Sequence, residues 1–242
     1  MERSVPFAEF EPIYEAILAD LGFDRGGDEG ARDLAAEYAR PFEERRLSVL
    51  NDACVAVVGA APSLQSELQT FDESAVDAVV AASTAVDILA DNGVRVDLMV
   101  TDLDKNVETA RELTHSGTPV AAHAHGDNIP ALREWLPKFD PDWTLVTTQA
   151  EPTGVVVNPG GFTDGDRAAF IAHAFGADEL QFVGWQFDDP SVGPLKARKL
   201  RWAEQLLYWL ERRRGERFGV LDGRRETLSE DPTQLSTVDE RR

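Results

Sequence analysis

The chain has 242 residues, 43% of them hydrophobic, which predicts one globular domain with an attachment. Forty-four Asp and Glu against twenty-four Lys and Arg give a formal net charge of −20, which argues against nucleic acid and anionic membrane surfaces as partners. The apolar runs are far shorter than the ~20 residues of a membrane span, so the sequence predicts no contact with a membrane.

The N-terminus and the single cysteine bear on the compartment and on covalent chemistry. Residues 1–6 lack the apolar core of a signal peptide, so we expect a cytoplasmic protein. Cys54 excludes an internal disulfide and cannot by itself form a cysteine-based zinc site. Its apolar neighbours indicate a small core residue.

Residues 1–50 show helical periodicity. Phe10 and Ile17 fall on one face of a first helix, and a second helical pattern is interrupted at Pro41. The glycine-rich segment 22–30 between them is typical of a loop. We expect a helical attachment without chemistry of its own.

The first predicted strand, 54–58, is apolar and leads directly into Gly59-Ala-Ala-Pro-Ser-Leu64. At a helix start such a turn leaves backbone N–H groups free for a phosphate, with Gly59, Pro62 and Ser63 as binding residues. A turn that only connects a strand to a helix needs the same residue types, so this segment alone does not decide between the two functions.

A second predicted strand, 76–82, is followed by a helix that ends at Asn92-Gly93. The third predicted strand ends in Asp102 and Asp104, at the sheet edge where open α/β sheets bind ligands. Two carboxylates this close can hold a hard cation, and Mg²⁺ typically takes one or two carboxylates plus phosphate oxygens. A solvated turn or a helix cap is the commoner role of an isolated Asp-X-Asp, so the choice depends on the polar clusters that follow.

The next polar cluster, His123-Ala-His-Gly-Asp-Asn128, follows a predicted strand that begins near residue 118. In an extended chain His123, His125 and Asp127 alternate on one side. Such a set can ligate a transition metal, or it can orient phosphate and add a carboxylate for magnesium. The preceding aspartate pair favours magnesium and phosphate.

Strands are also predicted at 145–149 and 154–158, and the second leads into Pro159-Gly-Gly-Phe-Thr-Asp-Gly-Asp-Arg167. Thr163, Asp164 and Asp166 stand at a predicted helix start, where carboxylates are ordinary partners of the helix dipole. This is nevertheless the third polar cluster that directly follows a strand. Three clusters at one sheet edge favour a shared site over capping alone.

After a last predicted strand, 179–185, Lys196 and Lys199 lie in the main basic segment of the acidic core region. They are three residues apart, hence neighbours on a helix surface, where they can bind phosphate as a pair. A solvated basic face is the alternative. Beyond Gly215 the polar composition predicts a partly disordered tail.

Strands and helices alternate over residues 51–215, which predicts the α/β class: a doubly wound, mostly parallel sheet with helices on both faces. The predicted organisation is therefore an N-terminal helical attachment over 1–50, this α/β domain, and a polar tail over 216–242.

Five segments in this order resemble the archaeal 6-hydroxymethyl-7,8-dihydropterin pyrophosphokinases: 59–64, 100–104, 123–128, 161–166 and 196–200. The resemblance covers roughly residues 50–210 and implies a fold similar to the catalytic domain of thiamine pyrophosphokinase. It also implies transfer of diphosphate from ATP to the hydroxymethyl group of a reduced pterin, with Mg²⁺ and with release of AMP, in tetrahydrofolate or methanopterin biosynthesis. Lys105 stands where members of this family more often have glycine.

Together with the clusters, the resemblance assigns a role to each candidate residue. The expected metal ligands are Asp102, Asp104, Asp127, Asp164 and Asp166. Asp102, Asp104, Asp127, Lys196 and Lys199 are expected to be catalytic. The expected nucleotide contacts are Gly59, Pro62, Ser63, His123, His125, Asn128 and Thr163. A flat pterin ring stacks on aromatic side chains and pairs with carboxylates or amides, which points to Asn158, Phe162, Trp185 and Asp188.

Other functions remain as alternatives: a thiamine pyrophosphokinase, a nucleotide-sugar transferase, or a non-catalytic nucleotide-binding sensor. The number of aspartates counts against the sensor. The sequence is also compatible with a homodimer.

The charged residues are unevenly chosen: four Lys stand against twenty Arg, and Asp is abundant. This composition resembles that of proteins from halophilic archaea, where molar salt screens an acidic surface. An ordinary acidic mesophilic protein is the alternative.

Overall fold

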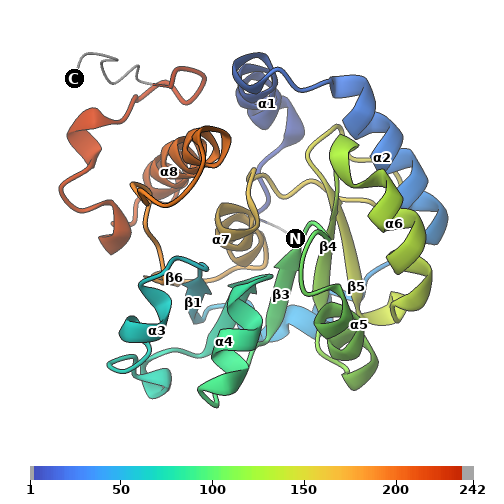
Figure 1. Ribbon diagram of the computed structural model, residues 1–242, viewed down its shortest axis with the longest axis horizontal. Coiled ribbons are helices and arrows are strands. Elements are labelled where there is room, and N and C mark those ends of the chain that lie inside the picture. The colour runs from blue at the N-terminus through green and yellow to red at the C-terminus, as the bar shows by residue number, and fades with distance from the viewer. Residues whose placement is uncertain (1–2, 236–242) are drawn as a thin grey trace.

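The computed structural model describes residues 3–235 and contains one six-stranded sheet in the order β5-β4-β3-β2-β1-β6 (Figure 1). Every strand pairs with its neighbours in parallel. The strands are β1 (Cys54–Val58), β2 (Ala78–Ala82), β3 (Leu98–Thr101), β4 (Val120–Ala124), β5 (Thr144–Thr148) and β6 (Glu179–Val183).

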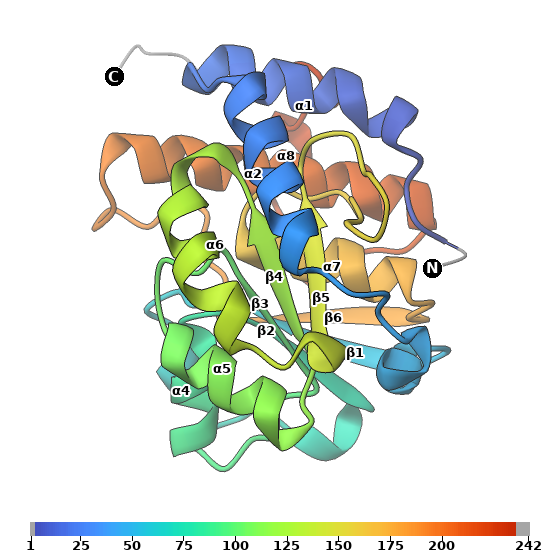
Figure 2. The same ribbon diagram turned by 90° about the vertical axis from the view of Figure 1, so that its right-hand side faces the viewer.

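Helices connect the strands and cover both faces of the sheet (Figure 2). The α-helices are α1 (Phe7–Leu21), α2 (Arg25–Tyr38), α3 (Leu64–Glu67), α4 (Ala85–Asp91), α5 (Val107–Ser116), α6 (Ile129–Trp135), α7 (Asp164–Ala174) and α8 (Pro194–Arg214). Short 3₁₀ segments span Glu44–Leu50, Glu73–Ala75, Gly126–Asn128, Leu136–Lys138, Pro141–Trp143, Gly219–Leu221 and Arg225–Thr227. None of the helices in residues 3–235 is long and apolar enough to cross a membrane.

The central strands β1, β2 and β3 are almost entirely apolar because both faces of the sheet are buried there. In β1, Val55 and Val57 belong to one hydrophobic cluster, whereas Ala56 and Val58 belong to the cluster on the opposite face. This is the pattern of a parallel sheet covered on both sides. The predicted doubly wound α/β fold is confirmed.

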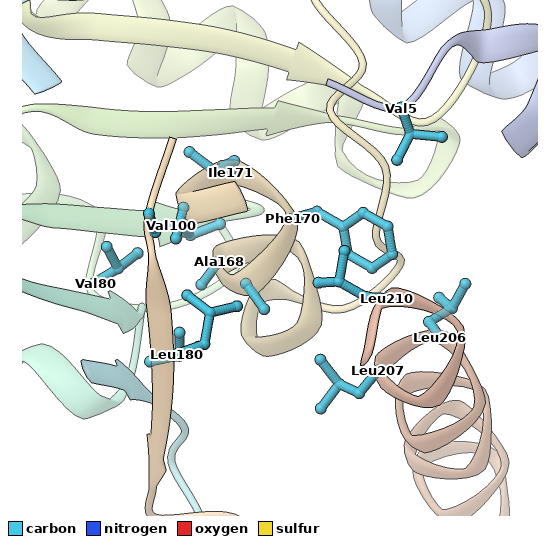
Figure 3. Close-up of a cluster of buried hydrophobic side chains, with 14 of the residues drawn as sticks. Val5, Val80, Val100, Ala168, Phe170, Ile171, Leu180, Leu206, Leu207 and Leu210 are labelled. Atoms are coloured by element: carbon cyan, nitrogen blue, oxygen red, sulfur yellow. The ribbon is translucent and has the colours of Figure 1, made fainter. Parts of the chain in front are cut away.

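The first cluster lies between the sheet and the helices α1, α7 and α8. Figure 3 shows Val80 and Val100 of the sheet near α7, and Phe170 of α7 beside Leu210 of α8. Phe10 of α1 also packs against Phe170, with ring centroids 6.4 Å apart. The N-terminal helix therefore shares the core of the α/β domain.

The second cluster lies on the other face, under α2, α4, α5 and α6 (Figures 1 and 2). Here Ala31 and Ala35 of α2 are fully buried. The loop expected over 22–30 is wrong from Arg25 onward, because α2 begins there. Asp24 caps this helix by accepting a hydrogen bond from the backbone N–H of Gly27 at 2.9 Å.

The strand expected over 154–158 is also wrong. Val157 forms only an isolated bridge with Thr147 at the edge of β5. The chain then turns away, because the amide of Asn158 donates to the carbonyls of Gln149 and Ala150, both at 2.9 Å.

Residues 216–235 belong to the segment expected to be a partly disordered tail, yet here they are folded onto α8. Phe218 and Leu221 are fully buried in the first cluster. Arg225 forms an ion pair of 2.6 Å with Glu211 of α8, which also accepts from the backbone N–H of Phe218. The rest of the expected tail, residues 236–242, lies outside the described residues.

Candidate active site

A cavity of about 550 Å³ opens at the carboxyl ends of the strands, and we call it the strand-end cavity. Residues that follow all six strands line it, among them Gly59, Ser83, Asp102, His125, Gln149 and Trp185. The first turns of α2, α7 and α8 complete the wall. The structure thus brings the three polar clusters of the sequence to one edge, where ligands of such sheets bind.

The loop after β3 holds Asp102 and Asp104 in a constrained conformation. Leu103 and Asn106 have left-handed backbones, with φ of 64° and 51°. The N–H of Leu103 donates to Thr101 Oγ1 at 3.0 Å, and that of Asp104 donates to Asp102 Oδ1 at 3.2 Å. A left-handed leucine costs about 1–2 kcal/mol, a strain of the kind found at functional sites.

The two carboxylates do not ionise alike. Burial opposes the charge on Asp102, but hydrogen bonds with His125 and Asp104 outweigh burial and hold the pKa of Asp102 below its ordinary value. Burial, and next the hydrogen bond and charge of Asp102, raise the pKa of Asp104. The pair therefore shares negative charge that a bound cation would relieve.

Behind this pair, His123 and His125 lie on the same side of β4 and its extension, as predicted. Their rings stack with centroids 5.9 Å apart, and His125 Nε2 lies 3.8 Å from Asp102 Oδ2. His123 Nδ1 is 3.0 Å from Thr147 Oγ1. Both histidines line the strand-end cavity.

Asn128 has a structural position instead of the expected nucleotide contact. Its amide nitrogen donates to the carbonyls of Asp102 at 2.6 Å and His123 at 2.7 Å, and its oxygen accepts from the N–H of His125. It does not line the strand-end cavity. Asn128 thus ties the end of β3 to the end of β4.

At the start of α7 the structure separates Asp164 from Asp166. Asp166 accepts from the backbone N–H groups of Phe162 and Thr163 and from the Thr163 hydroxyl, so that its oxygens cap the helix. Asp164 lines the strand-end cavity, as does Thr163. Burial, and next the charge of Asp102, raise the pKa of Asp164 well above its ordinary value.

Two buried nitrogens in the wall of the cavity have no hydrogen-bond partner within residues 3–235. Arg167 is 1% exposed, and its guanidinium donates to the Phe162 carbonyl at 3.0 Å while Nε stays unpaired. His123 is also 1% exposed, and its Nε2 has no partner. Buried polar atoms are normally hydrogen-bonded, so these two indicate room for a polar ligand.

Positive charge comes from the first turns of α8. Lys196 and Lys199 both line the strand-end cavity. The charge of Lys196 acts against the raised pKa of Asp104 and of Asp164, so Lys196 lies within electrostatic range of both carboxylates. Lys199 Nζ lies 5.7 Å from the ring centroid of Phe162.

Trp185 also lines the cavity, and a hydrogen bond and close packing fix its indole ring in the wall. Its indole N–H donates to the carbonyl of Val57 at 2.9 Å. Added Cβ atoms on Gly59 and Gly165 would lie 3.3 Å and 2.9 Å from the indole. The small size of Gly59 therefore serves the packing of Trp185 and of the Gly184 carbonyl, which would lie 2.6 Å from such a Cβ.

Six expected residues lie outside the strand-end cavity: Pro62, Ser63, Asn128, Asn158, Asp166 and Asp188. Asp188 pairs with Arg224 at 2.5 Å on the surface. The Ser63 hydroxyl neither caps its helix nor has a hydrogen-bond partner among the described residues. Asp127 remains in the cavity wall, exposed and in the 3₁₀ turn after β4.

Sequence reasoning missed the contribution of the N-terminal segment. Phe23 and Asp28 line the strand-end cavity together with Gln149, which follows β5. Asp28 occupies the same helix face as the buried Ala31 and Ala35. Asp28 therefore stands where helical spacing predicts an apolar residue, and this mismatch was the signal that could have identified it as a functional residue.

The cavity offers one carboxylate pair that suits magnesium, but no larger set of metal ligands is found within residues 3–235. Among residues 3–235, no group of three or more His, Cys, Asp or Glu side chains is arranged to hold a metal ion. Asp102 and Asp104 do form a carboxylate pair beside a cavity lined by lysines. Mg²⁺ is commonly bound by one or two carboxylates, with phosphate oxygens and water completing its coordination.

The fold and the cavity define a doubly wound α/β protein with paired carboxylates and lysines at its strand ends. Residues 33–191 match a protein family described as "6-hydroxymethylpterin diphosphokinase MptE-like". The chain belongs to this family of diphosphotransferases, and the resemblance seen in the sequence is confirmed.

Two individual relatives have names that agree with this family. The chain is 38% identical over 218 residues to a protein of Methanothermobacter thermautotrophicus, which covers 82% of this chain and 92% of that protein. It is 34% identical over 220 residues to a protein of Pyrococcus furiosus, with 84% and 93% covered. Both relatives are named 6-hydroxymethyl-7,8-dihydropterin pyrophosphokinase.

Proposed function

We propose that this chain transfers diphosphate from ATP to the hydroxymethyl group of 6-hydroxymethyl-7,8-dihydropterin, in tetrahydrofolate or methanopterin biosynthesis. The observation that carries the proposal is that Asp102, Asp104 and Lys196 line one cavity, with Lys196 in electrostatic range of Asp104. The names and family of the relatives support the same reaction.

In the proposed reaction the pterin hydroxyl oxygen attacks the β-phosphorus of ATP in line. A bond forms between this oxygen and the β-phosphorus, and the bond to the oxygen bridging the α- and β-phosphorus breaks. AMP leaves with that oxygen, and the hydroxyl proton is released. Positioning and electrostatics supply most of the rate in phosphoryl transfer.

The residues of the strand-end cavity divide this work. Asp102 and Asp104 would hold Mg²⁺, which supplies charge neutralisation to the phosphates when bound, while Asp127 and Asp164 line the same cavity and add negative charge near the ion. Lys196 and Lys199 neutralise the diphosphate that is transferred. His123, His125 and Thr163, which line the same cavity, orient phosphate oxygens. We assign no ligand contact to the six residues outside the cavity.

The proposal also covers the compartment and the partners of the enzyme. The net charge of −20 supports a protein without nucleic-acid or membrane partners in the cytoplasm. ATP and the reduced pterin are its proposed small-molecule partners.

The deciding experiment measures AMP release from ATP and Mg²⁺ with either the reduced pterin or thiamine as acceptor. We expect AMP with the pterin, in equal amount to the pterin diphosphate. AMP with thiamine alone would replace the pterin reading by a thiamine pyrophosphokinase. ATP binding without AMP from either acceptor would favour a sensor.

A further inference from the structure

Asp28 is a buried carboxylate that joins three separate elements. It is 3% exposed, yet it lies in the first turn of α2 and lines the strand-end cavity. It accepts hydrogen bonds from the Tyr14 hydroxyl of α1 at 2.8 Å, from Gln149 Nε2 at 2.7 Å and from the backbone N–H of Gly126 at 2.8 Å. These donors compensate the burial of its charge.

Two glycines allow this close approach of α2 to the end of β4. A Cβ on Gly126 would lie 3.1 Å from the carbonyl carbon of Gly27 and 3.4 Å from the backbone nitrogen of Asp28. Side chains at these positions would move the helix outward. The chain therefore keeps the contact that brings Asp28 to the cavity.

The network determines how the Gln149 side chain is oriented. Its amide nitrogen is committed to Asp28, so its oxygen is the atom left to accept a hydrogen bond, from the neighbouring His123 ring or from a ligand. Gln149 is 5% exposed and lines the strand-end cavity. Asp28 itself uses three of the roughly four acceptor positions of a carboxylate. This part of the wall thus presents oxygen acceptors.

Other groups in the same cavity suit a flat, polar-edged ring. Phe23 and Phe162 both line it, with ring centroids 6.5 Å apart and planes inclined by 39°. The unpaired Nε of Arg167 can only donate, so it suits an acceptor atom of the ring. Aromatic faces together with buried donors and acceptors are typical of a pocket for a heterocycle.

We propose that this N-terminal side of the strand-end cavity binds the heterocycle of the acceptor, with Gln149 as a specificity-determining residue and Asp28 as the residue that positions it. The inference rests on the proposed function and adds a location for the acceptor. An aminopyrimidinone edge carries a ring N–H next to an amino group, and these adjacent donors match the acceptors of Gln149 and Asp28. The adenine of ATP carries one amino group next to a ring acceptor, so it matches this wall less well.

Gln149→Met and Asp28→Asn test the proposal. Methionine keeps the length of Gln149 but removes its acceptor, and asparagine at position 28 gives the Gln149 amide a neutral partner. We expect each variant to raise the KM for the pterin about tenfold or more, while the KM for ATP stays within twofold. The double variant should lose less than the sum of the two single losses, because Asp28→Asn also disturbs the orientation of the Gln149 acceptor.

Two variants serve as matched controls. Tyr14→Phe removes another hydrogen bond to Asp28 but does not line the cavity, so it reports the structural part of the network. Asp33→Asn changes an exposed carboxylate of the same helix. Both should leave the pterin KM unchanged. If Asp28→Asn does not fold, Gln149→Met carries the test.

Titration of the oxidised pterin, followed by its fluorescence, gives a second readout without turnover. Gln149→Met should weaken this binding by a similar factor. A raised KM for ATP with unchanged pterin binding would overturn the location. Equal losses in Tyr14→Phe, Gln149→Met and Asp28→Asn would assign the network to folding alone. If the wild type binds the pterin but forms no AMP, the proposed reaction fails while the titration still decides the location.

Discussion

The joint between α7 and α8 contains a histidine whose protonation opposes folding. His173, in the last turn of α7, is 9% exposed, and its Nδ1 lies 3.0 Å from a guanidinium nitrogen of Arg214. Because a guanidinium can only donate, this ring nitrogen must be unprotonated in the folded protein. Burial, and next the charge of Arg214, lower the pKa of His173 from 6.5 to about 4.

The sign of the effect follows from proton binding. Between pH 6.5 and 4 the unfolded chain takes up a proton that the folded chain does not, so the free energy of unfolding falls as the pH falls. A pKa difference of about 2.5 units lowers the free energy of unfolding by about 3 kcal/mol at pH values below 4, and by about 2.5 kcal/mol at pH 4.5, relative to neutral pH. Above pH 6.5 the histidine is neutral in both states, so this stability is fully present.

Urea unfolding of the wild type and of His173→Asn, at pH 7.5 and at pH 4.5, measures this contribution. The asparagine oxygen can accept from Arg214 in place of Nδ1, but it does not titrate in this range. Carboxylates that titrate in both proteins cancel in the comparison. We expect the wild type to lose about 2.5 kcal/mol more than the variant between the two pH values. Equal losses would refute the reasoning, since His173 would then not be the titrating group.

Three further predictions concern the site, the backbone and the surface. Asp102→Asn should lower kcat for AMP release at least about 100-fold with an unchanged circular dichroism spectrum, and activity near that of the wild type would remove Asp102 from the mechanism. Gly161→Ala should destabilise the fold by about 3 kcal/mol, because φ is +84° and the new Cβ would lie 2.4 Å from the Arg167 Cα. Gly219→Ala, with open space around it, is the control, and similar unfolding free energies in both would contradict this account. The unfolding temperature should rise from low to molar KCl if the acidic surface is a halophilic adaptation, and a flat or falling midpoint would refute that origin.

The sequence by itself determined the architecture and the edge at which the site lies. The apolar run of β1 and its equivalents can only be buried on both faces, which requires a parallel sheet with helices on each side. In such a sheet all strands end at one edge. Asp102 follows β3 and His125 follows β4, so their meeting at that edge could be predicted without coordinates. Asp164 was expected there from a strand over 154–158 that the structure lacks, so its place was not determined by the sequence in the same way.

Only the tertiary structure decided which polar side chains face the cavity. Asp164 and Asp166 are two residues apart, yet one lines the cavity and the other caps α7, because neighbouring helix positions point in different directions and backbone N–H groups compete for the same oxygens. Asn128 likewise satisfies backbone carbonyls of two strands that are distant in sequence. The place of Asp28 depends on contacts with residues 98 and 121 positions away along the chain, and local periodicity carries no information about such long-range contacts.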